Sequence, residues 1–173
     1  MWMKLLGAAL VVGSCTGFGL GAARHLRERR RLLEILRQMI FHLRGEILYA
    51  NAPLSCALLR TGNRGSGWAA ALFTESAKEL EREGGEPFEV IWKRQVELLS
   101  GDTVLKEPDL KALLRFGMNL GYLDRDMQEK TMQLYLEELE LALERLRREE
   151  PDKSRLLFGM GVLGGLFLTV ILI

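Results

Sequence analysis

The sequence predicts an all-α protein: a cytoplasmic antiparallel bundle of about six helices, flanked by N- and C-terminal transmembrane helices. Three observations support this fold class. Uncharged apolar runs occupy residues 5–23 and 156–173, at the two ends of the 173-residue chain. Between them apolar residues recur at helical spacings of three and four. No stretch alternates convincingly with the period of two that is typical of a half-buried strand.

The two apolar runs are long enough to span a membrane. They hold 19 and 18 residues without a charge, and a helix of that length measures about 28 Å, close to a hydrocarbon core of about 30 Å. We therefore divide the chain into an N-terminal transmembrane helix at 1–23, a helical-bundle domain at 24–155 and a C-terminal transmembrane helix at 156–173.

Arginines flank both runs only on their inner sides. Lys4 is the one basic residue before the first run, and no charge follows the second. Because basic residues near a span are retained in the cytoplasm, we expect residues 24–155 to be cytoplasmic and both termini to lie across the membrane. The residues that determine this topology are Arg24, Arg27, Arg29, Arg30, Arg31, Lys153 and Arg155, together with Arg145, Arg147 and Arg148.

An exported lipoprotein anchored at Cys15 is an alternative. Lys4 followed by Leu5–Val12 resembles a short signal peptide, and Val12-Gly13-Ser14-Cys15 is a loose lipoprotein-type cleavage box. The arginine cluster after this segment would oppose export. Cys15 and Cys56 fall in different parts of the chain, so they predict no intradomain disulfide, and a reducing compartment fits.

The charge of the chain is nearly balanced, with 24 basic and 23 acidic residues. Nothing global therefore indicates a nucleic-acid-binding protein. The distribution is uneven: residues 24–31 carry a net charge of +4, whereas residues 75–109 carry ten acidic against five basic residues. We interpret these segments as topology control and a solvated acidic face, with some attraction of lipid headgroups to the basic segment.

The first helix is expected to continue from the apolar run to about residue 50, because no proline or obvious cap separates the two. Its apolar positions alternate spacings of three and four: Leu33, Leu36, Ile40, Leu43 and Ile47. Pro53 ends it and starts a short helix at 53–60, since the residue before a proline avoids the helical region.

Glycines and prolines divide the middle of the chain. Residues 62–67 are expected to form a flexible loop, and further helices are expected at 68–83, from Pro87 to 99 and at 107–116. Gly117 and Gly121 end or interrupt the last of these. The aromatic residues at helical spacing are expected in the core (Trp68, Phe73, Trp92 and Phe116), whereas Tyr122 is the candidate partner contact.

The last helix of the domain is expected at 125–149, with Asp124 as its cap. Its apolar positions are Met132, Leu136, Leu139, Leu143 and Leu146. We expect this helix to be the antiparallel partner of the first, because that pairing returns the chain to the membrane.

No catalytic, cofactor-binding or metal site is predicted. Gly62 and Gly67 have the spacing of a phosphate-binding loop, but Trp68-Ala69 occupies the place of the required Lys-Ser or Lys-Thr. His25 and His42 have no ligand partner at a metal-site spacing. A membrane-associated enzyme with a carboxylate or Ser catalytic group stays open as an alternative.

Small residues in the apolar runs indicate helix packing. They are Gly13, Gly17 and Gly21 in the first run and Gly161 and Gly165 in the second. Such positions let membrane helices approach closely, so they favour packing of the two spans or self-association into a homo-oligomer.

Several strings, in order, resemble the stage III sporulation protein AB family. They are Lys4-Leu5-Leu6-Gly7, Glu46-Ile47-Leu48-Tyr49, Pro53-Leu54, Phe116-Gly117, Leu120-Gly121, Asp124 and Gln128, followed by a glycine-bearing hydrophobic tail. The resemblance covers essentially the whole chain. It implies a helical domain similar to the cytoplasmic domains of the inner-membrane platform protein of type II secretion and type IV pilus systems.

The resemblance also implies a function. The protein would be a non-catalytic platform component of the channel between mother cell and forespore, located in the outer forespore membrane with its domain facing the mother-cell cytoplasm. Its partners would be other sporulation channel proteins and a cytoplasmic secretion-type ATPase. The family-like positions are Glu46, Tyr49, Pro53, Gly117, Gly121 and Asp124, which serve either partner binding or turn geometry and capping.

Overall fold

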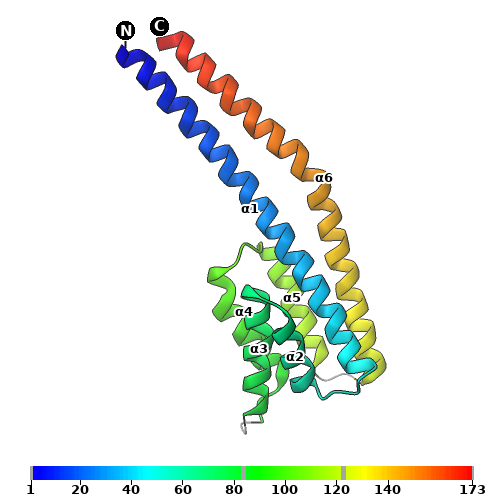
Figure 1. Cartoon of the computed structure of the whole chain (residues 1–173). Coiled ribbons are helices and arrows are strands. Elements are labelled where there is room, and N and C mark those ends of the chain that lie inside the picture. The colour runs from blue at the N-terminus through cyan, green and yellow to red at the C-terminus, as the bar shows by residue number, and fades with distance from the viewer. Residues whose placement is uncertain (1, 83–84, 122–123, 173) are drawn as a thin grey trace. The chain divides into compact units, whose positions relative to one another are not determined.

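The computed structural model describes the backbone of residues 2–82, 85–121 and 124–172, and within these ranges the side chains between residues 24 and 148. The described residues form six α-helices and one 3₁₀-helix, and they contain no strand, which confirms the all-α class (Figure 1). The helices are α1 (Trp2–Leu48), α2 (Leu54–Arg64), α3 (Gly67–Glu81), α4 (Phe88–Leu99), η1 (Ser100–Asp102), α5 (Glu107–Leu120) and α6 (Arg125–Leu172).

The chain separates into two units, one formed by residues 31–143 and the other by residues 1–30 and 144–173. The first contains α2 to α5 with the adjoining parts of α1 and α6, and we call it the bundle. The two predicted transmembrane helices fall on stretches whose side chains lie outside the described residues. Among the side chains that are described, no helical stretch is both long and apolar enough to cross a bilayer.

The predicted continuous first helix is confirmed, because α1 runs without a break from Trp2 to Leu48. The chain then turns at Asn51, whose φ of 54° is left-handed, a conformation that asparagine tolerates better than most residues. Pro53 precedes α2 directly and has an extended backbone with ψ 150°, so the proline marks the start of α2 as expected.

Between α2 and α3 the predicted loop at 62–67 is wrong in extent. Helix α2 continues to Arg64 and α3 begins at Gly67, so only Gly65 and Ser66 are non-helical. Gly62 is needed for packing, since a Cβ at this position would meet the Thr74 Oγ1 atom of α3. Gly67 is the turn glycine, with a φ of 71°.

The apolar stripes of α1 and α6 supply part of the core of the bundle, and buried side chains of α2 to α5 supply the rest. All five predicted α1 positions are buried, at 6% exposure or less. On α6 the prediction of Leu136 is wrong, because Leu136 is half-buried and Tyr135 takes its place in the core. The Tyr135 ring stacks on Phe116 with 4.8 Å between centroids. Burial raises the pKa of Tyr135 well above its ordinary value.

Trp92 is the centre of an aromatic cluster within the bundle. Its ring is fully buried and lies 5.5 Å from Phe73, 5.5 Å from Phe88 and 5.9 Å from Phe116. Its Nε1–H donates to the carbonyl of Leu113 at 2.9 Å, which links α4 to α5. Phe73, Trp92 and Phe116 are therefore core residues as predicted, while Trp68 is half-buried.

The prediction that α5 stops or breaks at Gly117 is wrong. Helix α5 runs through Gly117 to Leu120, and Gly121 follows as its C-terminal cap. A Cβ at Gly117 would collide with Cδ1, Cγ and Nε1 of Trp92. Gly117 is thus a packing glycine. Gly121 is the C-terminal cap with a right-handed helical backbone, and it is also closely packed, since a Cβ there would lie 3.0 Å from Phe88 Cβ.

The predicted antiparallel pairing of the first and last helices is confirmed inside the bundle. The Arg37 Nη1 atom lies 3.3 Å from Glu140 Oε1, and Arg44 Nη2 lies 2.9 Å from Glu129 Oε1. Residue numbers therefore rise along α1 as they fall along α6. The pairing brings the end of α1 and the start of α6 to the same end of the bundle.

Part of the acidic segment 75–109 is paired. Arg94 of α4 lies 3.2 Å from Glu79 of α3 and 2.6 Å from Glu86. Hydrogen bonds from Gln95 and Arg94 hold the pKa of Glu79 below its ordinary value, and the Arg94 hydrogen bond does the same for Glu86. The Glu79 pair joins α3 to α4, and the Glu86 pair joins the segment before α4 to α4 itself. These carboxylates are therefore more than a solvated face.

Candidate partner-binding surface

Five of the six family-like positions lie at or beside two turns at one end of the bundle. Glu46 and Tyr49 adjoin the turn between α1 and α2, which Pro53 closes, and Gly121 and Asp124 bound the turn between α5 and α6. The two turns are connected by Arg125, whose Nη2 donates to the carbonyls of Ile47 at 3.0 Å and Leu48 at 2.9 Å. We call Glu46, Tyr49, Pro53, Gly121, Asp124 and Arg125 the turn surface.

The Arg125 contact satisfies the end of α1. The last four carbonyls of a helix have no partner within it, and a cation near this end also interacts favourably with the helix dipole. Arg125 supplies both a donor and a charge. Because Arg125 is the first residue of α6, the contact ties the end of one long helix to the start of the other.

Asp124 is the N-terminal cap of α6, as predicted. Its Oδ1 accepts a hydrogen bond from the backbone N–H of Met127 at 2.9 Å, and its carbonyl accepts from the N–H of Gln128 at 2.8 Å. The Gln128 Nε2 atom donates to the carbonyl of Leu120 at 3.1 Å. These bonds fix the angle at which α6 leaves the turn after Gly121.

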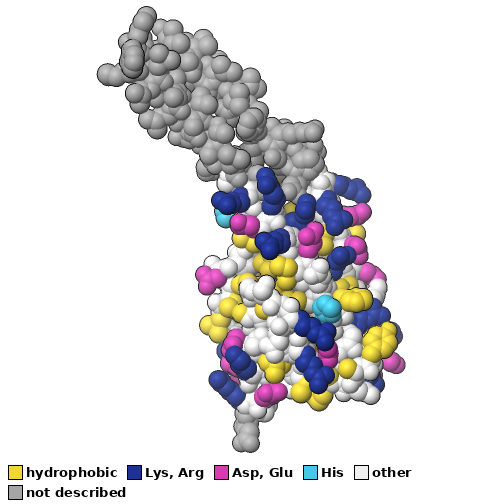
Figure 2. Space-filling model, in the orientation of Figure 1, with side chains coloured by type: hydrophobic (Ala, Val, Ile, Leu, Met, Phe, Trp, Pro, Cys, Tyr) yellow, Lys and Arg dark blue, Asp and Glu magenta, His cyan; other side chains and the backbone are white. Residues whose placement is uncertain are grey.

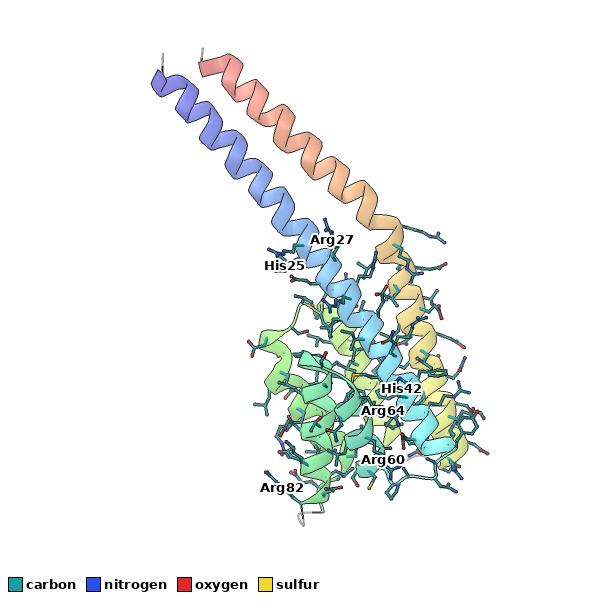
Figure 3. All side chains as sticks on the ribbon, in the orientation of Figure 1. His25, Arg27, His42, Arg60, Arg64 and Arg82 are labelled. Atoms are coloured by element: carbon teal, nitrogen blue, oxygen red, sulfur yellow. The ribbon has the colours of Figure 1, made fainter. Side chains whose placement is uncertain are left out.

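Glu46 connects α1 to α2. Glu46 is 8% exposed, and its carboxylate lies 3.0 Å from Arg60 and 3.2 Å from Arg64. Both arginine side chains are more than half exposed, and Figure 3 shows them on the same side of the bundle as His42 of α1. The geometry gives Glu46 a role in holding α2 and leaves two guanidinium groups facing solvent.

Tyr49 is the large side chain of the turn surface that is free to meet a partner. It is 84% exposed, and Pro53 beside it is exposed as well. An exposed tyrosine has a rigid apolar ring with a polar tip, a combination that is enriched at the centres of protein interfaces. Gly117, the sixth family-like position, lies apart from this surface in the contact with Trp92.

A groove between α1 and α6 is a second surface feature, and it was not predicted from the sequence. It has a volume of about 480 Å³, and its lining includes Arg37, Phe41, His42, Leu136 and Glu137. Phe41 is 64% exposed, and Leu134 and Leu141 of α6 are also exposed. Figure 2 shows exposed apolar side chains beside basic ones on the bundle. In the sequence, Phe41, Leu134 and Leu141 fall outside the buried positions that repeat every three or four residues. That offset could have identified them as exposed apolar residues.

Other predicted residues are only partly described. Gly21 has open space where a Cβ would lie. The other predicted packing glycines (Gly13, Gly17, Gly161 and Gly165), Lys153 and Arg155 lie in stretches of which only the backbone is described, and Tyr122 lies outside the described residues. Arg24, Arg27 and Arg31 are exposed, and Arg29 and Arg30 are half-buried. Among the described side chains, no three of His, Cys, Asp and Glu form a group that could hold a metal ion.

Comparison with known proteins gives one consistent result. The family model for stage III sporulation protein AB matches residues 4–173. The chain is 28% identical over 170 residues to "Stage III sporulation protein AB" of Bacillus subtilis (strain 168), covering 98% of this chain and 99% of the relative. It is also similar to a solved structure of "Stage III sporulation protein AB (SpoIIIAB)", with a TM-score of 0.66 and 26% identity over 72% of this chain and 98% of that chain. Because the family model matches nearly the whole sequence, this chain belongs to the stage III sporulation protein AB family.

Proposed function

We propose that this protein is a non-catalytic membrane platform component of the sporulation channel complex between mother cell and forespore. In this proposal the apolar ends of α1 and α6 anchor the chain in the outer forespore membrane, and residues 24–155 face the mother-cell cytoplasm. A secretion-type ATPase docks on the turn surface, and other channel proteins assemble around the anchors.

The observation that carries the proposal is the construction of the turn surface. The fold brings Glu46, Tyr49, Pro53, Gly121 and Asp124 together from turns about 70 residues apart, through the Arg125 contact with α1. Of these, Glu46 pairs with Arg60 of α2 and Asp124 caps α6, so both side chains stabilise the helices. Tyr49 makes the surface suitable for recognition because it is exposed on a rigid helix end.

The two long helices support a mechanical role. Helices α1 and α6 each continue without a break between an apolar end of the chain and the bundle. They are joined to each other at Arg37–Glu140, at Arg44–Glu129 and through Arg125. A partner that pushes on the turn surface therefore acts on the same two helices that carry the apolar runs, and no bond chemistry is needed.

Three described glutamates and one serine are poorly suited to the alternative of an enzyme with a carboxylate or Ser catalytic group. A general acid or base works best with a pKa near the operating pH, which for a glutamate requires a raised value. The pKa values of Glu79, Glu86 and Glu107 are instead lowered, with hydrogen bonds to Gln95, Arg94 and Lys111 as the respective main causes. The Ser76 hydroxyl is buried and without a hydrogen-bond partner, whereas a serine nucleophile needs an adjacent base.

Replacing Tyr49 with alanine tests the docking surface. Tyr49→Ala in the full chain, purified in mild detergent, is expected to weaken capture of the cognate secretion-type ATPase by at least about tenfold, because exposed tyrosines at interface centres contribute much of the binding energy. The unfolding transition should be unchanged, since the side chain is 84% exposed.

Leu98→Ala is the matched control. Leu98 is 69% exposed on α4 and belongs to neither the turn surface nor the α1–α6 groove. The control should capture the ATPase as the wild-type chain does. Equal capture by the Tyr49→Ala and wild-type chains would contradict docking on the turn surface.

A further inference from the structure

Arginines are concentrated in the unit formed by residues 1–30 and 144–173, next to the apolar runs. Residues 24–30 contain four arginines and one glutamate, and residues 144–148 contain three arginines and one glutamate. Residues 149–155 add three acidic and two basic residues, so a clear positive surplus remains. We call Arg24, Arg27, Arg145, Arg147 and Arg148 the arginine collar.

The collar side chains lie at the surface. All five are exposed, and Figure 2 shows basic side chains crowded at one edge of the coloured surface. The Arg148–Glu144 pair has a long N–O distance of 3.9 Å, and the two side chains are 80% and 57% exposed. A pair of this kind contributes little, so it leaves the charge of Arg148 available to a stronger anion.

The spacing of the collar suits a phosphate group. Arg24 and Arg27 are three residues apart on α1, as are Arg145 and Arg148 on α6, and residues at this spacing are neighbours on one helix face. A guanidinium forms two parallel hydrogen bonds with phosphate oxygens, which a lysine cannot do. Two such groups on one face can hold a single phosphodiester.

The position of the collar along the helices favours a lipid headgroup over other phosphate-bearing anions as the ligand. If residues 5–23 span the bilayer, as the proposed function holds, Arg24 and Arg27 follow within about 6 Å of the hydrocarbon boundary. Headgroups occupy roughly the first 5–8 Å beyond that boundary. Arg148 precedes the second run by eight residues, or about 12 Å, where surface attraction is already reduced by a screening length of about 8 Å.

From this arrangement we infer that the arginine collar binds anionic phospholipids, with Arg24 and Arg27 contacting the headgroup phosphates directly. Arg145, Arg147 and Arg148 add longer-range attraction to the same leaflet. Basic residues near an anionic surface each contribute about 1 kcal/mol, so loss of the two contacting arginines should lower the selectivity severalfold. Lys153 and Arg155 directly precede the second run and should preserve part of it. The collar then selects the lipid around the anchors, in addition to setting topology.

Lipid retention by the full chain tests the inference. The chain is incubated in neutral-detergent micelles that contain equal amounts of phosphatidylglycerol and phosphatidylcholine, and the co-purified lipids are measured by mass spectrometry. The wild-type chain is expected to retain phosphatidylglycerol in severalfold excess. Replacing the contacting pair, Arg24→Gln with Arg27→Gln, should reduce that excess by at least about fivefold.

A second double variant, Lys93→Gln with Lys111→Gln, removes the same charge from the bundle. Both lysines are more than 60% exposed, in pairs with Glu97 and Glu107 on their own helices, and this variant should retain lipid as the wild-type chain does. Equal ratios of phosphatidylglycerol to phosphatidylcholine in all three chains would overturn the lipid inference and leave the proposed membrane anchoring unaffected. Release of the wild-type chain from membranes by carbonate washing would overturn the membrane anchoring and the inference together.

Discussion

Replacing Gly117 with alanine is expected to lower the free energy of unfolding of the bundle by about 3 kcal/mol. The added Cβ collides with three ring atoms of Trp92. The ring cannot move aside, because it is fully buried, bonded to the Leu113 carbonyl and enclosed by Phe73, Phe88 and Phe116. Overpacking of a filled core costs about 1–3 kcal/mol, and the rigid surroundings place this case at the upper end.

Guanidinium unfolding of the full chain in mild detergent, followed by near-ultraviolet circular dichroism, measures this effect. Gly45→Ala is the control, because Gly45 lies within α1 and a Cβ added there would have nothing within 4 Å. That substitution should raise stability by about 0.5–1 kcal/mol through the backbone entropy of glycine. If Gly117→Ala also raises the free energy of unfolding, a Cβ at residue 117 does not collide with the Trp92 ring as described.

Replacing Trp92 with alanine is expected to cost about 4 kcal/mol. Truncation of a buried tryptophan leaves a cavity, and such substitutions cost about 3–5 kcal/mol. Here the Leu113 carbonyl also loses the hydrogen bond that links α4 to α5. The ring contacts with Phe73 on α3 and Phe116 on α5 disappear as well, so three helices lose their common centre.

A double-mutant cycle measures whether Trp92 and Gly117 act as one unit. In the Trp92→Ala chain the space beside residue 117 is empty, so adding Gly117→Ala should become neutral or stabilising instead of destabilising. The interaction energy between the two substitutions should then be about 3 kcal/mol. Additive effects would show that the cost of Gly117→Ala has a source other than the Trp92 ring.

The fold is predictable where the signal is local. The α1 stripe at Leu33, Leu36, Ile40, Leu43 and Ile47 repeats with the helical period, and all five side chains are buried. Asp124 is recognisable as a cap because an aspartate just before an apolar-periodic segment satisfies the first free N–H groups of a helix. Both features depend on residues within a few positions of each other.

Glycine is hard to interpret where its role depends on another helix. The sequence predicts loop or breaking positions at Gly62 and Gly117, yet each lies inside a helix and faces a side chain from a neighbouring helix, Thr74 and Trp92 respectively. Composition cannot separate a packing glycine from a turning glycine such as Gly67. Likewise, helical spacing alone allows either Tyr135 or Leu136 in the core, and the stacking partner Phe116 decides for Tyr135.

The candidate site is predictable as residues but not as a surface. The family-like strings include Glu46, Tyr49, Pro53, Gly121 and Asp124, which lie in two separate segments of the sequence. What joins the segments is the Arg125 contact with Ile47 and Leu48, across 77 or more residues of sequence. A side-chain bond to a backbone carbonyl leaves no pattern in the sequence, so the connection emerges only from the fold.

The proposed topology holds the bundle in the cytoplasm between two membrane anchors, and the accessibility of a cysteine placed on the bundle tests it. Asn63→Cys places a thiol at an exposed position of α2, in a chain whose native Cys15 and Cys56 are replaced with serine. The chain is expressed in vegetative cells, so that it inserts in the plasma membrane and one side of its anchors faces the medium. A membrane-impermeant maleimide should label this thiol only after these cells are permeabilised. Labelling of the same thiol in intact cells would place the bundle outside and rule out the proposed topology.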